Sequence, residues 1–202
     1  MQNQITQDNG LNKQAEELAV FPLKLFILPQ GRQRLRIFEA KYVSMVGNIR
    51  SDEGFVIAYS DASQPFGISN WGTLVKIVDF HIGDDGLLLI DVEGQQIVSL
   101  HGHHYQSDGL LVATPTAIKH WDNPVDLEPN STLAETLERV FKNYEYIADL
   151  YTDTHFEKAE WVCSRLIEVM PVALDVKEKF IEPDSFPQLV TFLLDLIDES
   201  RN

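Results

Sequence analysis

The chain has 202 residues and a formal net charge of −15, because 31 Asp and Glu side chains outnumber 16 Lys and Arg. This acidity argues against non-specific nucleic-acid binding, which draws most of its affinity from basic side chains that neutralise phosphates. It argues equally against docking on anionic membranes. A hydrophobic content of 44% is enough to build a core in one large domain or two small ones.

The cysteine content and the N-terminus bear on the compartment. Cys163 is the only cysteine, so an intramolecular disulfide is excluded and a reducing compartment is favoured. Residues 1–15 are polar, rich in Gln and Asn, and expected to be disordered. They lack the apolar stretch of a signal peptide, and no apolar run in the chain reaches the length of a membrane span. We therefore expect a cytoplasmic protein.

Residues 16–120 carry β-strand signals. An apolar run at 20–28 leads into a turn marked by Pro29 and Gly31. The alternation that follows is typical of a half-buried strand, and a helix is expected next. The later strands are predicted at 55–59, 73–80, 87–92, 96–100 and 110–118. Those at 87–92 and 96–100 are expected to pair around Glu93 and Gly94. Several short strands joined by turns predict a small barrel or a folded sheet.

The last third of the chain carries helical signals. Residues 121–130 contain Asp, Asn and two prolines and are interpreted as a linker. Apolar side chains then recur at helical spacing. Helices are predicted at 131–151 and 154–171, with a short one from 175 and a last one from 187. The whole pattern predicts an α+β fold, in which a β-barrel at 16–120 is followed by a helical bundle at 131–202.

Several pieces of sequence, taken in their order, resemble the N-terminal domain of Lon proteases. The first group is Phe21-Pro22-Leu23, Leu28-Pro29, Gly31, Ile37-Phe38-Glu39 and Lys41-Tyr42. Later pieces are Gly72-Thr73-Leu74-Val75-Lys76-Ile77, Val92-Glu93-Gly94, and a helical segment with Trp161, Arg165-Leu166, Glu168 and Pro171. The resemblance extends from about residue 16 onward. It implies a PUA-like β-barrel followed by helices, and a domain that recognises polypeptide substrates.

The catalytic motifs of Lon proteases are not found in this sequence. A nucleotide engine needs a GxxxxGK[ST] loop, whose backbone amides cradle phosphates, and the chain has none. The resemblance does not reach the Ser–Lys dyad of the peptidase. We therefore expect a non-catalytic substrate-binding domain without a cofactor. Its partners would be unfolded or specific polypeptides, and its role that of an adaptor or modulator in protein quality control or proteolysis.

The basic side chains concentrate on one predicted strand. Arg32, Arg34 and Arg36 alternate and should share a face. Three interpretations are open: a site for an acidic peptide, a solvated face, or a dock for the acidic helical half. The stripe is also the one feature that favours the alternative function, an RNA-binding module of the PUA type.

A second candidate site lies in and beside a loop. Phe66, Ile68 and Trp71 are large apolar residues near turn residues, and aromatic side chains on loops are common interface anchors. We predict a peptide- or partner-binding role for them, with ordinary core packing as the alternative. An apolar patch of this kind also leaves a homodimer open.

Two further groups of polar residues could carry chemistry. His101, His103 and His104 offer imidazoles, but the defined spacing and fourth ligand of a structural zinc site are missing, so we interpret them as a polar strand end and predict no metal. Glu157, Glu160 and Glu168 are expected on the solvated face of the second helix. A hydrolase built from such residues is the weakest hypothesis, because no assembled catalytic site is apparent.

Overall fold

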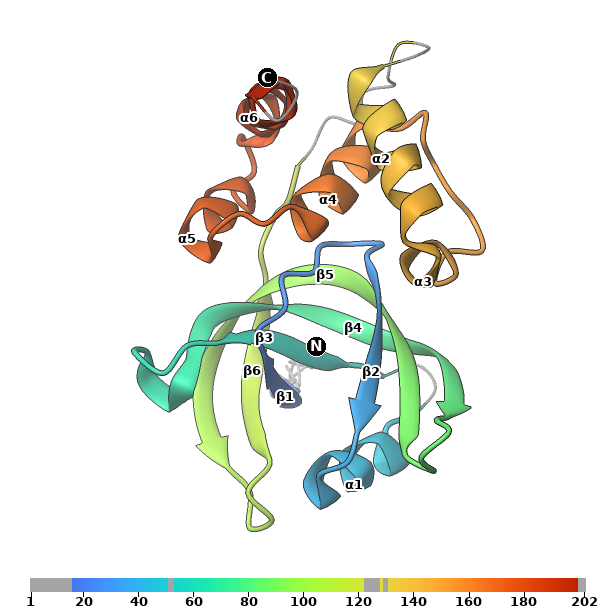
Figure 1. Cartoon of the computed structure of the whole chain (residues 1–202). Coiled ribbons are helices and arrows are strands. Elements are labelled where there is room, and N and C mark those ends of the chain that lie inside the picture. The colour runs from blue at the N-terminus through green and yellow to red at the C-terminus, as the bar shows by residue number, and fades with distance from the viewer. Residues whose placement is uncertain (1–15, 51–52, 122–127, 129–130, 200–202) are drawn as a thin grey trace, which may run out of the picture.

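The computed structural model describes residues 16–50, 53–121, 128 and 131–199 (Figure 1). The predictions for the N-terminal segment 1–15 and for most of the linker therefore lie outside the described residues. A sheet with one flanking helix occupies the first part of the chain, and helices occupy the last part. The predicted α+β class and the order of its two parts are confirmed.

Six strands form one mixed sheet that closes into a ring. They are β1 (Leu18–Leu23), β2 (Arg32–Ile37), β3 (Phe55–Ser60), β4 (Ile68–Ile82), β5 (Leu88–Tyr105) and β6 (Leu111–Ala117). Their order is β2-β5-β4-β3-β1-β6, and pairing of β5 with β6 closes the barrel. β1 runs parallel to β3, whereas the other pairs are antiparallel. Strand β2 pairs with the first half of β5, along the same edge that β6 occupies in the second half.

The barrel is filled according to the alternation of its strands. In β2, Leu35 and Ile37 point inward and are buried, while the arginines that alternate with them are not. Helix α1 (Ala40–Asn48) covers this part of the interior with Tyr42, Met45 and Val46. The predicted stripe on one face of β2 is thus present, because period-two alternation places residues i and i+2 on the same side of a sheet.

The predicted hairpin at Glu93 and Gly94 is wrong. Residues 88–105 form the single long strand β5, which passes through Gly94 and pairs with β4 on both sides of it. Glycine is needed there for close approach, because a Cβ would overlap the carbonyl of Leu28, whose segment crosses directly over the strand. Gly94 also exchanges backbone hydrogen bonds with this turn, accepting from the Gln30 amide at 2.7 Å and donating to the Gly31 carbonyl at 2.8 Å.

The first apolar run also divides differently from the prediction. Its strand ends at Leu23, and residues 25–28 leave the sheet and cross toward the helices. Phe26 and Leu28 are buried there, in a core shared with the helical half. The sequence showed one apolar run because both segments are buried, although in different cores.

The helical half is divided more finely than expected. Its elements are α2 (Thr132–Asn143), α3 (Glu145–Ala148), α4 (Ala159–Val169), α5 (Leu174–Lys177), the 3-10 turn η2 (Glu178–Phe180) and α6 (Phe186–Glu199). The predicted helix 131–151 is interrupted at Tyr144, whose backbone leaves the helical region. The short turn α3 then directs the chain back toward the barrel (Figure 1).

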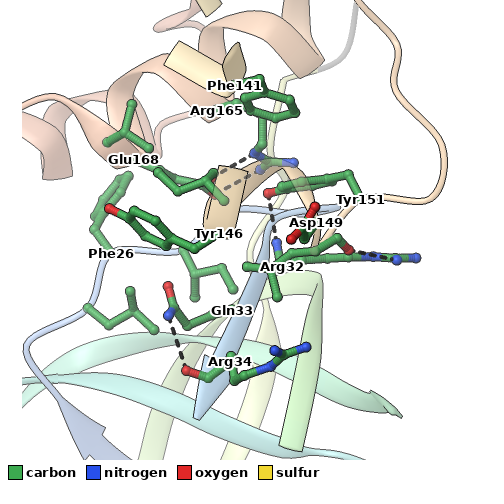
Figure 2. Close-up of a pocket in the computed structure, with 15 residues that line it drawn as sticks. Phe26, Arg32, Gln33, Arg34, Phe141, Tyr146, Asp149, Tyr151, Arg165 and Glu168 are labelled. Carbon is green, nitrogen blue, oxygen red and sulfur yellow. Dashed lines mark hydrogen bonds and ion pairs between the residues drawn. The ribbon is translucent and has the colours of Figure 1, made fainter. Parts of the chain in front are cut away.

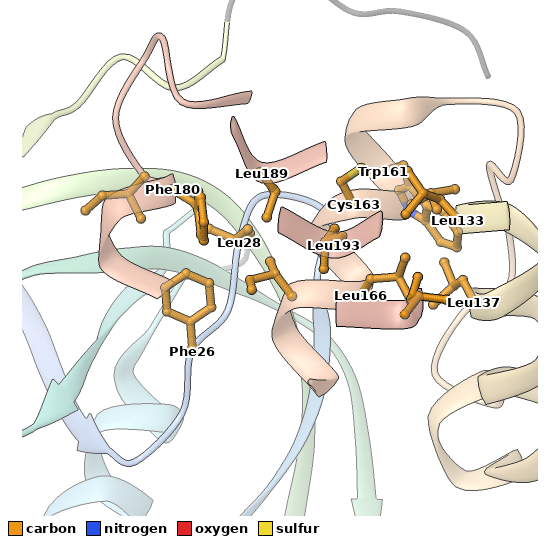
Figure 3. Packing of buried hydrophobic residues seen from close by; sticks show 14 of the residues in the cluster. Phe26, Leu28, Leu133, Leu137, Trp161, Cys163, Leu166, Phe180, Leu189 and Leu193 are labelled. Carbon is orange, nitrogen blue, oxygen red and sulfur yellow. The ribbon is translucent and has the colours of Figure 1, made fainter. Parts of the chain in front are cut away.

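One hydrophobic core joins the two halves. Figure 3 shows Leu28 and Phe26 of the crossing segment among Leu166, Leu189 and Leu193 of the helices. Trp71 and Ile97 of the barrel belong to the same buried cluster. Because this core is continuous, the clefts at the joint between the barrel and the helices have walls of defined shape.

Candidate functional site

A pocket of about 450 Å³ opens at the joint, and we call it the arginine cleft (Figure 2). One wall is the crossing segment with the first half of β2, and the other comes from α2, α3, the turn after α3, and α4. Its lining residues are Leu25, Phe26, Ile27, Arg32, Gln33, Arg34, Phe141, Tyr146, Ile147, Asp149, Leu150, Tyr151, Arg165, Glu168 and Val169.

The apolar lining is partly open to solvent. Tyr146 of α3 is 72% exposed, and Val169 at the end of α4 is 39% exposed. Leu25 and Ile147 are half-buried beside them. Val169 lies at the cleft because α4 ends there. An accessible apolar surface framed by charged side chains is typical of a site that takes up apolar groups.

A buried ion pair on α4 holds the cleft together. Arg165 is 1% exposed, and its Nε and Nη2 donate to Glu168 Oε2 and Oε1 at 2.6 and 2.7 Å. Glu168 Oε1 also accepts a hydrogen bond from the Leu28 amide at 2.7 Å, and Arg165 Nη2 donates to the Pro29 carbonyl at 3.0 Å. The pair therefore fixes α4 against the crossing segment of the barrel.

The prediction that Glu168 lies on a solvated face is wrong. Burial raises the pKa of its carboxyl above the ordinary value, while the guanidinium of Arg165 opposes this rise. The sequence held a signal for the burial of Arg165, the partner of Glu168. Arg165 follows the inward Trp161 by four residues, which places it on the buried face of the helix. Glu157 is exposed but precedes α4, which begins at Ala159, and Glu160 is half-buried.

The arginine stripe of β2 is paired along its length. Arg32 and Arg34 each bond the acid directly opposite on β5, Arg32 through Nε to Glu93 at 2.8 Å and Arg34 through Nε to Asp91 at 2.7 Å. Arg36 forms an ion pair with Asp85. The stripe is thus a ladder of ion pairs within the barrel, which sequence reasoning missed because the β2–β5 register was unknown.

Arg32 also contacts the helical half. Its Nη1 donates to the Leu150 carbonyl at 3.0 Å, and its backbone amide donates to the Tyr151 hydroxyl at 2.9 Å. The interpretation as a dock for the helices therefore holds for this one arginine. Burial raises the pKa of Tyr151 to about 12, so its hydroxyl stays protonated at neutral pH. Arg34 keeps a part-exposed guanidinium at the rim of the cleft.

The second predicted group is only partly at the surface. Ile68 and Trp71 are buried, and Trp71 belongs to the core of the joint. Phe66 is exposed and stacks on His103, with ring centroids 5.2 Å apart. None of the three residues lines the arginine cleft. Their predicted binding role stays a prediction, which Phe66 alone could fulfil through an exposed side chain.

A second cleft borders both halves and differs in charge. It measures about 770 Å³, and we call it the acidic cleft. Trp71 lies in its wall, and its indole Nε1 donates to Glu178 at 2.9 Å. The acids that line it are Asp61, Asp175, Glu178 and Glu182, and no lysine or arginine is among its lining residues.

The histidines of β5 do not gather around one point. His101 bonds Ser99, His103 stacks on Phe66, and His104 faces Glu17 at 3.8 Å. A different group could hold a cation, since the ligand atoms of Asp79, His81 and Asp91 lie within 4.8 Å of one another. The guanidinium of Arg34 already occupies this group. It bonds both oxygens of Asp91 at 2.7 Å and contacts His81 at 3.1 Å.

These features define a two-part domain, a closed mixed β-barrel with a helical bundle fixed to it, and its open clefts lie at the joint. Residues 17–200 match the family described as the ATP-dependent protease La (LON) substrate-binding domain. The chain belongs to this family. The match covers nearly all the described residues, and the sequence contains no ATPase or peptidase domain.

Two solved structures support the fold. A Lon N-terminal domain protein from Xanthomonas campestris is similar with a TM-score of 0.67 and 26% identity, over 89% of this chain and 98% of that chain. The N-terminal domain of a Mycobacterium avium complex Lon protease has a TM-score of 0.54 and 13% identity, over 89% and 97%, which shows the fold alone. No curated protein matches the sequence. Within the described part of the chain, no helix is long and apolar enough to cross a membrane.

Proposed function

We propose that this protein is a non-catalytic polypeptide-binding domain and that client segments enter the arginine cleft. The observation that carries this proposal is the accessible apolar lining of a cleft in a domain of the Lon substrate-binding family. Tyr146 and Val169 offer contact area without any change of fold. Apolar side chains exposed on an unfolded chain would gain from leaving water there.

The rim of the cleft carries charges of both signs. Arg34 and Asp149 both line it, so it carries both signs near an apolar surface. Asp91 balances much of the charge of Arg34 through two hydrogen bonds. We therefore expect the apolar content of a segment to dominate affinity, with charge acting mainly on its orientation.

Two neighbouring tyrosines provide a matched test. Tyr146 lines the cleft and Tyr144 does not, although both are exposed and their rings lie 6.1 Å apart. Tyr146→Ser and Tyr144→Ser therefore lose the same Tyr–Tyr contact. Binding of a fluorescently labelled, permanently unfolded polypeptide, followed by anisotropy, should weaken about tenfold in Tyr146→Ser, because one aromatic anchor is lost. Tyr144→Ser should bind like the wild type.

Two results would overturn the proposal. One is the absence of any binding of the unfolded polypeptide by the wild type. The other is an equal effect of the two tyrosine variants, which would place binding elsewhere on the molecule. The adaptor or modulator role in protein quality control follows only if the first test succeeds.

The alternative functions have less support. The arginines that favoured RNA binding are paired with Glu93, Asp91 and Asp85, which leaves little unbalanced positive charge for phosphates. For a hydrolase, the buried pair of Arg165 and Glu168 is the one strongly perturbed acidic site at the cleft, and its hydrogen bonds serve to fix the joint. We therefore propose neither function.

A further inference from the structure

The far end of strand β4 is an open edge. Up to Val75, β4 pairs with β3 on one side and with β5 on the other. From Lys76 to Ile82 it pairs with β5 only, among the residues that the structure describes. Figure 1 shows this hairpin of β4 and β5 extending from the barrel on the side away from the C-terminal helices α2–α6. An open edge presents backbone groups that can pair with another strand.

Two large apolar side chains stand on this edge. Phe80 is 57% exposed and Ile82 is 72% exposed. Their direct neighbours on β5 are Ile90 and Leu88, which belong to or pack against the core of the barrel. The apolar inner face of the sheet therefore continues past the core to an uncovered edge. Natural edge strands limit such pairing with charges, prolines or β-bulges, and here an irregularity between Ile77 and Asp79 interrupts the regular pairing before the segment that carries Phe80 and Ile82.

We propose that this edge pairs antiparallel with the same edge of a second copy, in a two-fold symmetric dimer centred on Phe80. In that register Phe80 lies opposite Phe80 of the other copy, and Val78 lies opposite Ile82. Asp79 then lies opposite His81, so that an acid faces an imidazole. Within residues 78–82 every apolar residue meets an apolar residue, which is the self-complementarity that a two-fold interface needs.

Neighbouring registers are less complementary. A centre at Asp79 sets two carboxylates opposite each other, and a centre at His81 sets two imidazoles opposite each other. Like charges directly opposite across a strand pair are destabilising, which disfavours the centre at Asp79, and the centre at His81 sets Val78 opposite Asp84 and Asp79 opposite Gly83. The charge pattern of residues 78–82 therefore selects both the second copy as occupant and the register of pairing. None of residues 78–82 lines either cleft.

The oligomeric state tests the surface. Sedimentation equilibrium from micromolar to submillimolar concentrations should give a mass approaching twice that of the 23.0-kDa chain. Ile82→Lys should weaken the dimer by about tenfold or more, because it replaces a buried aliphatic side chain with a charge in both copies. The control is Val43→Lys, an exposed apolar residue of α1 rather than of β4, which should leave the dimer unchanged.

Disulfide cross-linking tests the register. The native Cys163 is buried, which raises the pKa of its thiol to about 12, so an introduced cysteine is the reactive one. Under mild oxidation, Phe80→Cys should form a covalent dimer with itself. Asp79→Cys and His81→Cys should each cross-link poorly alone and readily when mixed, since these positions face each other across the two copies.

Four outcomes would overturn the proposal. The first is a wild type that stays monomeric over the whole concentration range. The second is a dimer that Ile82→Lys does not weaken, which would place the interface elsewhere. The third is cross-linking that favours another register. A monomer whose β4 edge instead binds an unfolded peptide would also reject the second copy as the occupant.

Discussion

The two clefts at the joint are built from the same halves of the molecule but in opposite ways. In the arginine cleft, acids are matched by bases, and the most buried pair, Arg165 and Glu168, ties α4 to the crossing segment. In the acidic cleft, carboxylates gather without a lysine or arginine among the lining residues, and one hydrogen bond from Trp71 to Glu178 spans the joint. The difference teaches that buried electrostatics fix one side of the joint, whereas packing fixes the other.

Removing one glutamate from each cleft should give the largest contrast. Glu168→Ala leaves Arg165 buried without its partner and the Leu28 amide without its acceptor, so it should destabilise the fold by about 3–5 kcal/mol. Glu178→Ala removes only the acceptor of the Trp71 indole and should cost about 1 kcal/mol. Urea unfolding measures both values. Equal costs would remove the distinction between the clefts.

A methyl group added at Gly31, next to the buried pair of Arg165 and Glu168, should have the next largest effect on stability. A Cβ at Gly31 would overlap Glu168 Oε1 and lie 2.9 Å from the Leu28 carbonyl oxygen. Gly31→Ala should therefore lower the free energy of unfolding by about 1–3 kcal/mol through overpacking. The control is Gly47→Ala in α1, where a Cβ meets nothing within 4 Å. That change should stabilise the helix by up to about 1 kcal/mol.

The pH dependence should show the smallest effect, through the ion-pair ladder of β2. The hydrogen bonds from Arg34 hold the pKa of Asp91 below its ordinary value. An acid with a lowered pKa in the folded state contributes stability above its unfolded pKa, near 4, and loses it as the pH falls through the folded-state pKa. Asp91→Asn should therefore be less stable than the wild type at pH 7, by about 1 kcal/mol or less. The difference should vanish in strong acid, and one that grows on acidification would contradict this origin.

The alternation of β2 and the apolar stripes of the helices were enough to predict the α+β order. They were enough because period-two and helical spacing are local properties of the chain. The residues of the arginine cleft could not be assembled in the same way. Glu93 and Asp91 face the arginines only in the β2–β5 register, and Glu168 is buried only because the crossing segment passes over it. Gly94 looked like a turn because the sequence does not reveal that another backbone lies against it.

An amide-resolved NMR titration of the protein with an unfolded polypeptide tests the central claim most directly. We expect shifts that gather on the crossing segment 25–27, on residues 146–151 and around Val169, while the signals of the acidic cleft stay in place. Shifts confined to the acidic cleft or to the loop around Phe66 would contradict the assignment of the client site. The absence of shifts at a large excess of polypeptide would contradict the proposed function itself.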